Sequence, residues 1–221
     1  TSGSWYSQTA LNTAKDQTAG AGTTATALNF GGGPPNSALT EKWNGSSWTE
    51  VNDLNTARRA ISGTGATGEA ALAFSGLVPA AQTVTESWNG SNWTEVNDLN
   101  TARGVNGAGT ANTAALAFGS GSALTESYNG TSWTEVNDLN TAKALSAGFG
   151  DYNSAIDCGG EVSSSNSALT ELWNGTSWTE VNDMNTARYG QAAAGVSNSS
   201  GIIFGGATPI KADAETWNGT S

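Results

Sequence analysis

Acidic side chains are the groups of this chain best able to do chemistry, because it has no histidine and a single cysteine, Cys158. Without histidine, Ser-His-Asp and Cys-His catalysis and imidazole-containing metal sites are excluded. Two carboxylates about 5–9 Å apart would suit glycoside hydrolysis. The non-repeated acids Asp151, Asp157 and Asp213 are the candidates for such chemistry, so a carboxylate-based enzyme acting on glycans stays open as an alternative function.

Other acids recur through the chain together with basic residues. An active site needs different roles from neighbouring groups, whereas a charge copied into each repeat is expected to join structural units through ion pairs or backbone caps. The acids are Glu41, Glu86, Glu126, Glu171 and Glu215, and the basic residues are Lys15, Arg58, Arg103, Lys143 and Arg188.

Asn-Asp pairs at 52–53, 97–98, 137–138 and 182–183 carry the oxygen ligands that calcium prefers, but the same residues are ordinary turn formers. We expect turns there. The sequence therefore predicts no catalytic residue, no metal site, no cofactor and no enzymatic activity.

Charge and composition limit the classes of partner that this chain is expected to bind. Eight Lys and Arg stand against 19 Asp and Glu, a net charge of −11. Such a chain has little with which to neutralise phosphates, so we expect no nucleic-acid partner. No apolar run reaches the length of a spanning helix, so no membrane insertion is expected. The Ser-, Thr-, Asn- and Gly-rich composition favours an extracellular or virion-surface location.

One unit is repeated five times. The segment WNGSSWTEVNDLNTAR, from Trp43 to Arg58, returns almost unchanged at 88–103, 128–143 and 173–188. Its second Trp falls at positions 48, 93, 133 and 178, so the spacings are 45, 40 and 45. A degraded copy begins at Trp5, and a further copy begins at Trp217. Internal repetition of this length indicates a repeat architecture.

Each repeat predicts four short strands. The first begins in the stretch 57–61, the second is an apolar triplet that leads into Gly, the third is Thr40–Trp43, and the fourth is Ser47–Val51. Asn44-Gly45 between the last two is a strong hairpin signal, because both residues tolerate positive φ. Four strands in 40–45 residues, with aromatic residues and glycines that recur at fixed places, are typical of a β-propeller blade.

The order Gly-Gly, Thr-Glu-x-Trp-Asn, Trp-Thr-Glu-Val and Leu-Asn-Thr-Ala-Arg resembles the kelch repeat over essentially the whole chain. Trp replaces the usual Tyr in four units, only three units carry the full Gly pair, and the turn between the third and fourth strands is shorter. The resemblance implies a propeller. The activity of the copper radical oxidases with kelch-like propellers is not carried over, because their ligands include histidine.

We therefore predict an all-β protein: a single five-bladed, kelch-like β-propeller over residues 1–221, with four antiparallel strands in each blade. The blades are expected at about 14–52, 57–97, 102–137, 142–182 and 187–221. The strand 4–8 at the N-terminus is expected to pair with the C-terminal strands, which completes the last blade and closes the ring. A closed ring leaves no end blade with an uncovered apolar face.

The repeated aromatic residues are predicted to form the structural core between blades, since each buries a large apolar surface. They are Trp5, Trp43, Trp48, Trp88, Trp93, Tyr128, Trp133, Trp173, Trp178 and Trp217.

Residues that break the repeat are the better binding candidates. The connection between the second and third strands varies in length, and in a four-stranded blade it lies on the same face as the blade-to-blade connection. The predicted ligand rim consists of Pro34, Pro35, Asn36, Val78, Pro79, Gln82, Glu161, Ser164, Asn166, Pro209 and Lys211.

These features favour a non-enzymatic recognition or structural module that binds glycan or protein through its rim. We expect it to be a surface appendage or a virion component resembling a phage tail or fibre, as part of a larger assembly. An engineered or duplicated repeat scaffold without a ligand is the other alternative.

Overall fold

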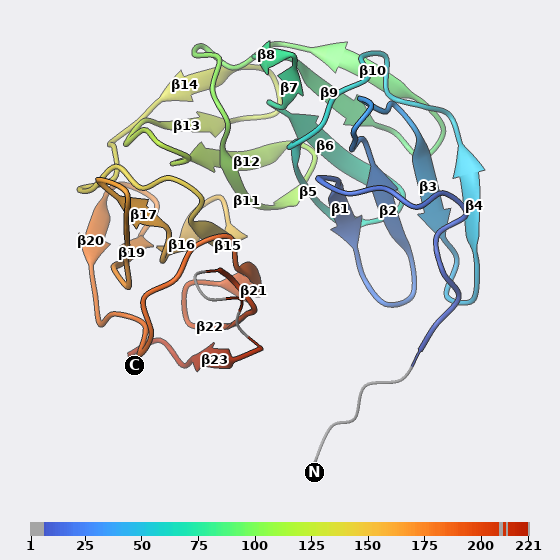
Figure 1. The fold of residues 1–221 in the computed structure, drawn as a ribbon. Helices are drawn as coiled ribbons and strands as arrows, with labels where there is room; N and C mark the ends of the chain where they lie inside the picture. Colours follow the sequence, from blue (N-terminus) through green and yellow to red (C-terminus); the bar gives the residue numbers. More distant parts are fainter. Residues whose placement is uncertain (1–6, 208–209, 211, 221) are drawn as a thin grey trace.

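The protein is described by a computed structural model that covers residues 7–207, 210 and 212–220. Within these residues every element of regular secondary structure is a β-strand. Consistent with this, no described helix is long and apolar enough to cross a membrane. Five small antiparallel sheets stand around a common axis, so the fold is a five-bladed β-propeller (Figure 1), as the repeat predicted.

The blades follow one another along the chain, each running from its inner strand outwards. Blade 1 consists of β1 (Ala19–Gly22), β2 (Ala27–Phe30), β3 (Thr40–Trp43) and β4 (Trp48–Val51). Blade 2 consists of β5 (Ser62–Thr67), β6 (Ala70–Phe74), β9 (Thr85–Trp88) and β10 (Trp93–Val96). Blade 3 consists of β11 (Asn106–Ala111), β12 (Ala114–Phe118), β13 (Thr125–Tyr128) and β14 (Trp133–Glu135).

Blade 4 consists of β15 (Ala147–Asp151), β16 (Ser154–Cys158), β19 (Thr170–Trp173) and β20 (Trp178–Glu180). Blade 5 consists of β21 (Ala192–Ser197), β22 (Ser200–Phe204) and β23 (Ala214–Trp217). Two further hairpins lie inside the connections of blades 2 and 4: β7 (Leu77–Val78) with β8 (Ala80–Ala81), and β17 (Glu161–Val162) with β18 (Ser165–Asn166).

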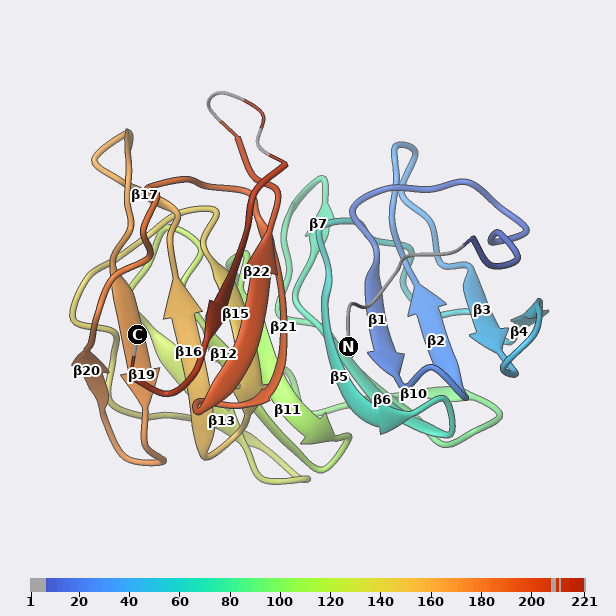
Figure 2. The same cartoon turned by 90° about the horizontal axis from the view of Figure 1, so that it is seen from below.

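Blade 5 has three described strands, and its expected fourth strand at 4–8 falls mainly on residues 1–6, outside the described part. Ser7 and Gln8 are described and are not in a strand. The inner strands of blades 1 to 5 pack side by side in sequence, β1 on β5, β5 on β11, β11 on β15 and β15 on β21. No comparable packing joins β21 to β1 within the described residues, and Figures 1 and 2 show these two strands apart.

Small residues on the inner strands let neighbouring blades approach. A β-carbon on Gly63 of β5 would lie 2.5 Å from the ring of Phe30 in blade 1. Gly107 meets Phe74 and Gly148 meets Phe118 in the same way at the next two interfaces. Each Phe is fully buried, so the repeated Gly provides the space that an aromatic side chain of the preceding blade fills.

The Asn-Gly turn between the third and fourth strands forms as expected. The backbone N–H of Asn44 donates to the carbonyl of Ser47, and Asn44 Oδ1 accepts from the N–H groups of Ser46 and Ser47. Gly45 has φ +94°, a conformation that favours glycine. The side chain of Asn44 therefore specifies the turn that places Trp43 opposite Trp48.

The predicted start of the first strand is wrong. Residues 57–61 precede β5, which begins at Ser62, and belong to the blade-to-blade linker. The N–H of Arg58 donates to the carbonyl of Ser37, its own carbonyl accepts from Gly32, and Ala60 has φ +48°. These bonds to the previous blade and a left-handed residue prevent the segment from joining its own sheet.

Candidate functional site

The repeated charges hold each blade-to-blade linker against the next blade. Arg58 from the linker forms a buried ion pair with Glu86 on β9. The second oxygen of Glu86 accepts from the backbone and side-chain nitrogens of Asn55 at 2.7 and 2.8 Å. The ion pair and the backbone cap therefore occur together on one carboxylate. Corresponding contacts are Arg103–Glu126 at 2.5 Å, Lys143–Glu171 at 3.5 Å and Arg188–Glu215 at 2.7 Å.

The first linker departs from this pattern. Lys15 Nζ donates to the carbonyl of Leu39 at 2.8 Å, while Glu41 accepts from the backbone N–H groups of Asn12 and Thr13. Burial lowers the pKa of Lys15, against the opposing effect of Glu41. The linker nevertheless lies on blade 1 as the other linkers lie on theirs.

No turn is formed at the Asn-Asp pairs, in contrast to the expectation, and their Asp side chains instead bind the third strand of the same blade. Asp53, Asp98, Asp138 and Asp183 each accept, through Oδ1, the N–H of the Thr that begins the third strand, at 2.9–3.2 Å. No group of three or more Cys, Asp and Glu side chains in the described part of the chain is arranged to hold a metal ion.

The repeated aromatic residues lie at the blade interfaces. Trp93 of blade 2 packs edge-on against Phe30 of blade 1 with ring centroids 4.9 Å apart, and its indole N–H donates to Thr40 Oγ1 at 3.0 Å. Trp133 and Trp178 repeat both contacts at the next two interfaces. Trp43, Trp88, Trp93, Tyr128, Trp133, Trp173 and Trp178 are buried, Trp48 and Trp217 are half-buried, and Trp5 lies outside the described residues.

Blade 4 carries a buried polar cluster that does not recur. Asp157 on β16 is fully buried, with Oδ2 at 3.1 Å from Lys143 Nζ and Oδ1 accepting from Asn106 Nδ2 at 3.2 Å. Burial raises the pKa of Asp157 above its ordinary value, and Lys143 opposes this effect. Burial also raises the pKa of the neighbouring Cys158 to about 12, so the thiol stays protonated at neutral pH. Asp151 and Asp213 are the other two candidate catalytic acids. Asp151 is half-buried, and Asp213 is exposed.

The pH dependence of stability tests this cluster. Because the folded-state pKa of Asp157 is raised, its contribution to stability is complete below the unfolded pKa of about 4 and is lost as pH rises through the folded pKa. We expect Asp157→Asn to remove this decline when urea unfolding is measured across acidic and neutral pH. Asp151→Asn, at a half-buried acid of the same blade, is the control; an equal effect of both variants would contradict the assignment.

The variable connections lie on one face of the propeller. Backbone bridges join the linker just before the inner strand to the connection of the same blade in four cases: Asp16–Gly33, Arg59–Leu77, Ala144–Glu161 and Tyr189–Ala207. In Figure 2 the hairpins that contain β7 and β17 project on the same side of the molecule. The chain order therefore brings the connections together around one opening of the ring.

The predicted rim residues differ in exposure. Pro34, Pro35, Pro79, Ser164 and Asn166 are exposed, Asn36, Val78, Gln82 and Glu161 are half-buried, and Pro209 and Lys211 lie outside the described residues. Asn36 Oδ1 accepts from Arg59 at 2.9 Å, which fixes the loop of blade 1 to blade 2. Gln82 Nε2 donates to the carbonyls of Val78 and Ala80 and closes its own hairpin. Arg59 was missed as a rim residue; its only sequence signal is a second Arg directly after the repeated one.

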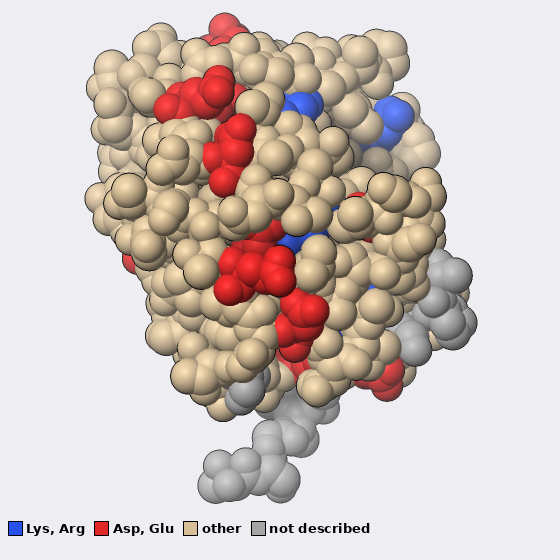
Figure 3. Space-filling model, turned by 90° about the vertical axis from the view of Figure 1, so that its left-hand side faces the viewer, with Lys and Arg blue, Asp and Glu red and all other residues tan. Residues whose placement is uncertain are grey.

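A central channel is a further feature that the sequence did not indicate. It has a volume of about 680 Å³ and is lined by the inner strands of all five blades, with Gly, Ala and Thr predominating. It presents no ionisable side chain among its lining residues. Exposed acids gather instead on the outer side of blades 3 and 4 (Figure 3), where Glu135 and Glu180 lie on the outer strands β14 and β20.

The fold and the rim define the class of protein as a five-bladed β-propeller with repeated interfaces and unequal loops. Comparison of the sequence with protein-family models gives no match, and comparison with curated proteins gives none either. The resemblance to the kelch repeat therefore stays a prediction from the residues.

Proposed function

We propose that the protein is a non-enzymatic binding module that recognises a glycan or a protein through the rim formed by its second-to-third-strand connections. The supporting observation is that the repeated residues and the variable residues have different roles in the structure. The repeated Glu, Arg, Lys and Asn side chains hold each linker against the blade that follows it, whereas the connections that vary in length lie on one face.

The chemistry of these connections suits adaptable polar contacts. Ser164 and Asn166 provide exposed polar groups, and Pro34, Pro35 and Pro79 provide stiff turns. This combination carries little charge and suits sugar hydroxyls or a polar protein surface. We place the protein outside the cell or on a virus particle, as a surface appendage within a larger assembly; its acidic, Ser-, Thr- and Asn-rich composition supports this location.

A loop exchange tests the proposal. The connection of blade 3 is the shortest. Its Gly121 N–H donates to the backbone carbonyl of Lys143, so this connection supports the following linker without a hairpin. Residues 32–37, 76–82 and 160–167 are each replaced by Ser120-Gly121-Ser122. The parent chain is expected to bind members of a glycan array or a panel of cell surfaces, and the exchanged chain is expected to bind at least about tenfold more weakly.

Ser91→Ala, in an exposed turn at the opposite end of blade 2, is the matched control and is expected to leave binding unchanged. Equal melting temperatures would separate lost contacts from unfolding. Absence of binding by the parent chain, or equal binding after the loops are exchanged, would contradict the proposed function.

A further inference from the structure

Blade 4 departs from the repeat at two positions whose side chains meet. Its linker carries Lys143 where blades 2, 3 and 5 carry Arg, and its second strand carries Asp157 where those blades carry Ala or Ile. The corresponding pairs are Arg58 with Ala73, Arg103 with Ala117 and Arg188 with Ile203. A lysine and a carboxyl group therefore replace an Arg and an apolar residue together, which indicates a joint role.

The lysine and the carboxyl group are in contact inside the blade. Lys143 Nζ lies 3.1 Å from Asp157 Oδ2, and both side chains are fully buried. Oδ2 has no other hydrogen-bond partner among the described residues, while Oδ1 accepts from Asn106 Nδ2 at 3.2 Å. Burial raises the pKa of Asp157, which favours the uncharged carboxylic acid. The two groups that form an amide are therefore within reach of each other.

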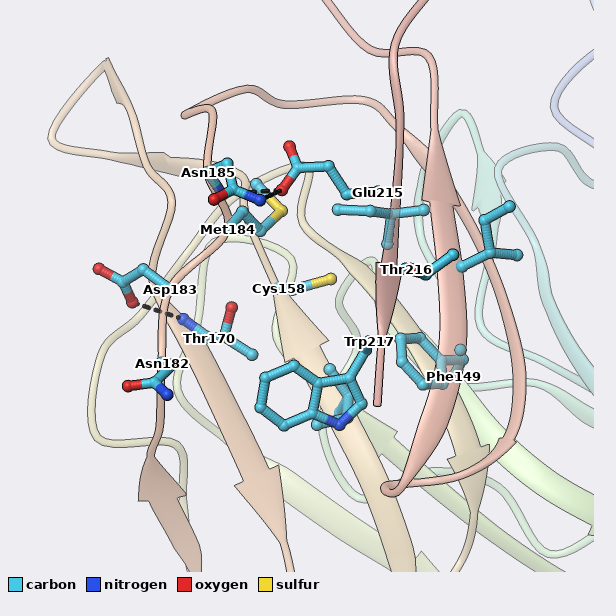
Figure 4. A pocket seen from close by; sticks show the side chains of 14 residues that line it. Phe149, Cys158, Thr170, Asn182, Asp183, Met184, Asn185, Glu215, Thr216 and Trp217 are labelled. Carbon is cyan, nitrogen blue, oxygen red and sulfur yellow. Dashed lines mark hydrogen bonds between the residues drawn. The ribbon is translucent and has the colours of Figure 1, made fainter. Parts of the chain in front are cut away.

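The contact lies on the face of blade 4 that is turned towards blade 3. Figure 4 shows Cys158, the next residue of β16, among the side chains that line the hollow between blades 4 and 5. Successive residues of a strand point to opposite faces, so Asp157 points away from this hollow, towards Asn106 of β11. Glu171 of β19 is the sheet partner of Asp157, and its Oε1 lies 3.5 Å from Lys143 Nζ. A second carboxylate therefore stands beside the pair.

We propose that Lys143 Nζ and Asp157 Cγ become joined by an intramolecular amide bond, a covalent modification that ties the linker of blade 4 to β16. The reaction is a condensation: the Nζ–Cγ bond forms, the Cγ–Oδ2 bond breaks, and one water molecule leaves. Nothing is oxidised or reduced, so the two side chains are the only reactants. This inference concerns how blade 4 is held and does not depend on the proposed ligand.

The neighbouring side chains are placed to assist the reaction. A proton passes from the Lys143 ammonium to Oδ2 of Asp157, and the uncharged pair is favoured because burial disfavours both charges. The amine then attacks Cγ, and the N–H of Asn106 stabilises the negative charge that develops on Oδ1. Glu171 accepts a proton from Nζ and passes it to Oδ2, which leaves as water. The backbone N–H and Nδ2 of Asn140 donate to the other oxygen of Glu171 at 2.7 and 2.8 Å, which fixes this carboxylate in place.

Mass spectrometry of the denatured full chain tests the bond. The parent is expected to be lighter than its sequence mass by one water molecule, and trypsin is expected to cut after Lys42 but not after Lys143, whose amine is blocked. Lys42 is the matched control because its Nζ lies closer to a carboxylate, 2.6 Å from Glu69 Oε1, in a pair that is open to solvent. A parent chain of full sequence mass that is cut after both lysines overturns the proposal.

Cleavage between the two joined residues locates the bond. Chymotrypsin cuts at Phe149 and Tyr152, so the peptides that carry Lys143 and Asp157 are expected to stay linked after digestion. A water deficit that is found in any other peptide assigns the loss to a different reaction and overturns the proposal.

Variants that restore the residues of blade 3 separate the bond from folding. Lys143→Arg and Asp157→Ala introduce the residues found at Arg103 and Ala117, so both variants are expected to fold and to have the full sequence mass. A water deficit that persists in either variant contradicts an amide between these two groups. Glu171→Gln keeps both reactants and removes the proton acceptor, so the bonded fraction soon after cell-free synthesis is expected to be at least about tenfold lower than in the parent. An equal fraction contradicts the mechanism.

The pH dependence of stability gives a second readout, because Asp157 titrates only while it is unbonded. The decline of stability with rising pH that is expected for its free carboxyl group is therefore a property of the newly synthesised chain. This decline is expected to disappear as the water deficit develops. A decline that persists in fully bonded protein contradicts the modification of Asp157.

Discussion

Replacement of Arg58 by Met is expected to lower the free energy of unfolding by about 3–5 kcal/mol, because it leaves the buried carboxylate of Glu86 without its cation. Arg58 is fully buried, and its Nε also donates to the carbonyl of Ser75 at 2.9 Å. The substitution keeps most of the side-chain volume, so the expected loss comes from the charge and the hydrogen bonds. Urea unfolding at neutral pH measures it.

The neighbouring Arg59 supplies the control. Arg59 is half-buried and its side chain donates to Asn36 Oδ1, so Arg59→Met is expected to cost about 1 kcal/mol. Combining Arg58→Met with Glu86→Leu should recover much of the loss, since the unpaired charge is then removed. If the double variant were as unstable as Arg58→Met alone, the loss could not be assigned to the isolated carboxylate.

The blade architecture could be predicted because short-range rules repeat. The Asn-Gly turn places Trp43 against Trp48 through hydrogen bonds that span only four residues. The same residues recur in the later copies of the repeat. Five copies of a local rule give five blades without knowledge of any long-range contact. The predicted first strand begins too early because Ala57–Ile61 has the local pattern of a strand, while Arg58 and Ala60 form their backbone bonds with the previous blade.

The candidate site was less predictable because its shape depends on residues that occur once. The hairpins β7–β8 and β17–β18 are only two residues per strand, too short for a periodic signal. The Arg59–Asn36 contact and the Lys143–Asp157 pair join residues of different elements, and no repeat marks them. The sequence could locate the variable connections, but the three-dimensional contacts determine which of their side chains remain exposed.

The interface aromatic residues should have an effect of similar size to the buried ion pair. Trp133→Ala is expected to destabilise the protein by about 3–5 kcal/mol, because it empties a slot in a close-packed interface. The ring of Trp133 lies 5.0 Å from that of Phe74 and 5.1 Å from that of Tyr128, and its N–H donates to buried Thr85. Denaturant unfolding monitored by circular dichroism measures the loss without relying on Trp fluorescence.

Trp133→Phe separates the two contributions. It keeps an aromatic ring in the slot and removes the N–H donor, so most of its cost is expected to be that of one hydrogen bond, about 1 kcal/mol, plus incomplete packing. An equal loss in Trp133→Ala and Trp133→Phe would mean that the bond to Thr85, and not the bulk of the ring, holds blades 2 and 3 together. Because Trp93 and Trp178 make the same contacts, their Ala variants should show the same order of losses, which would identify the slot as the unit that stabilises each interface.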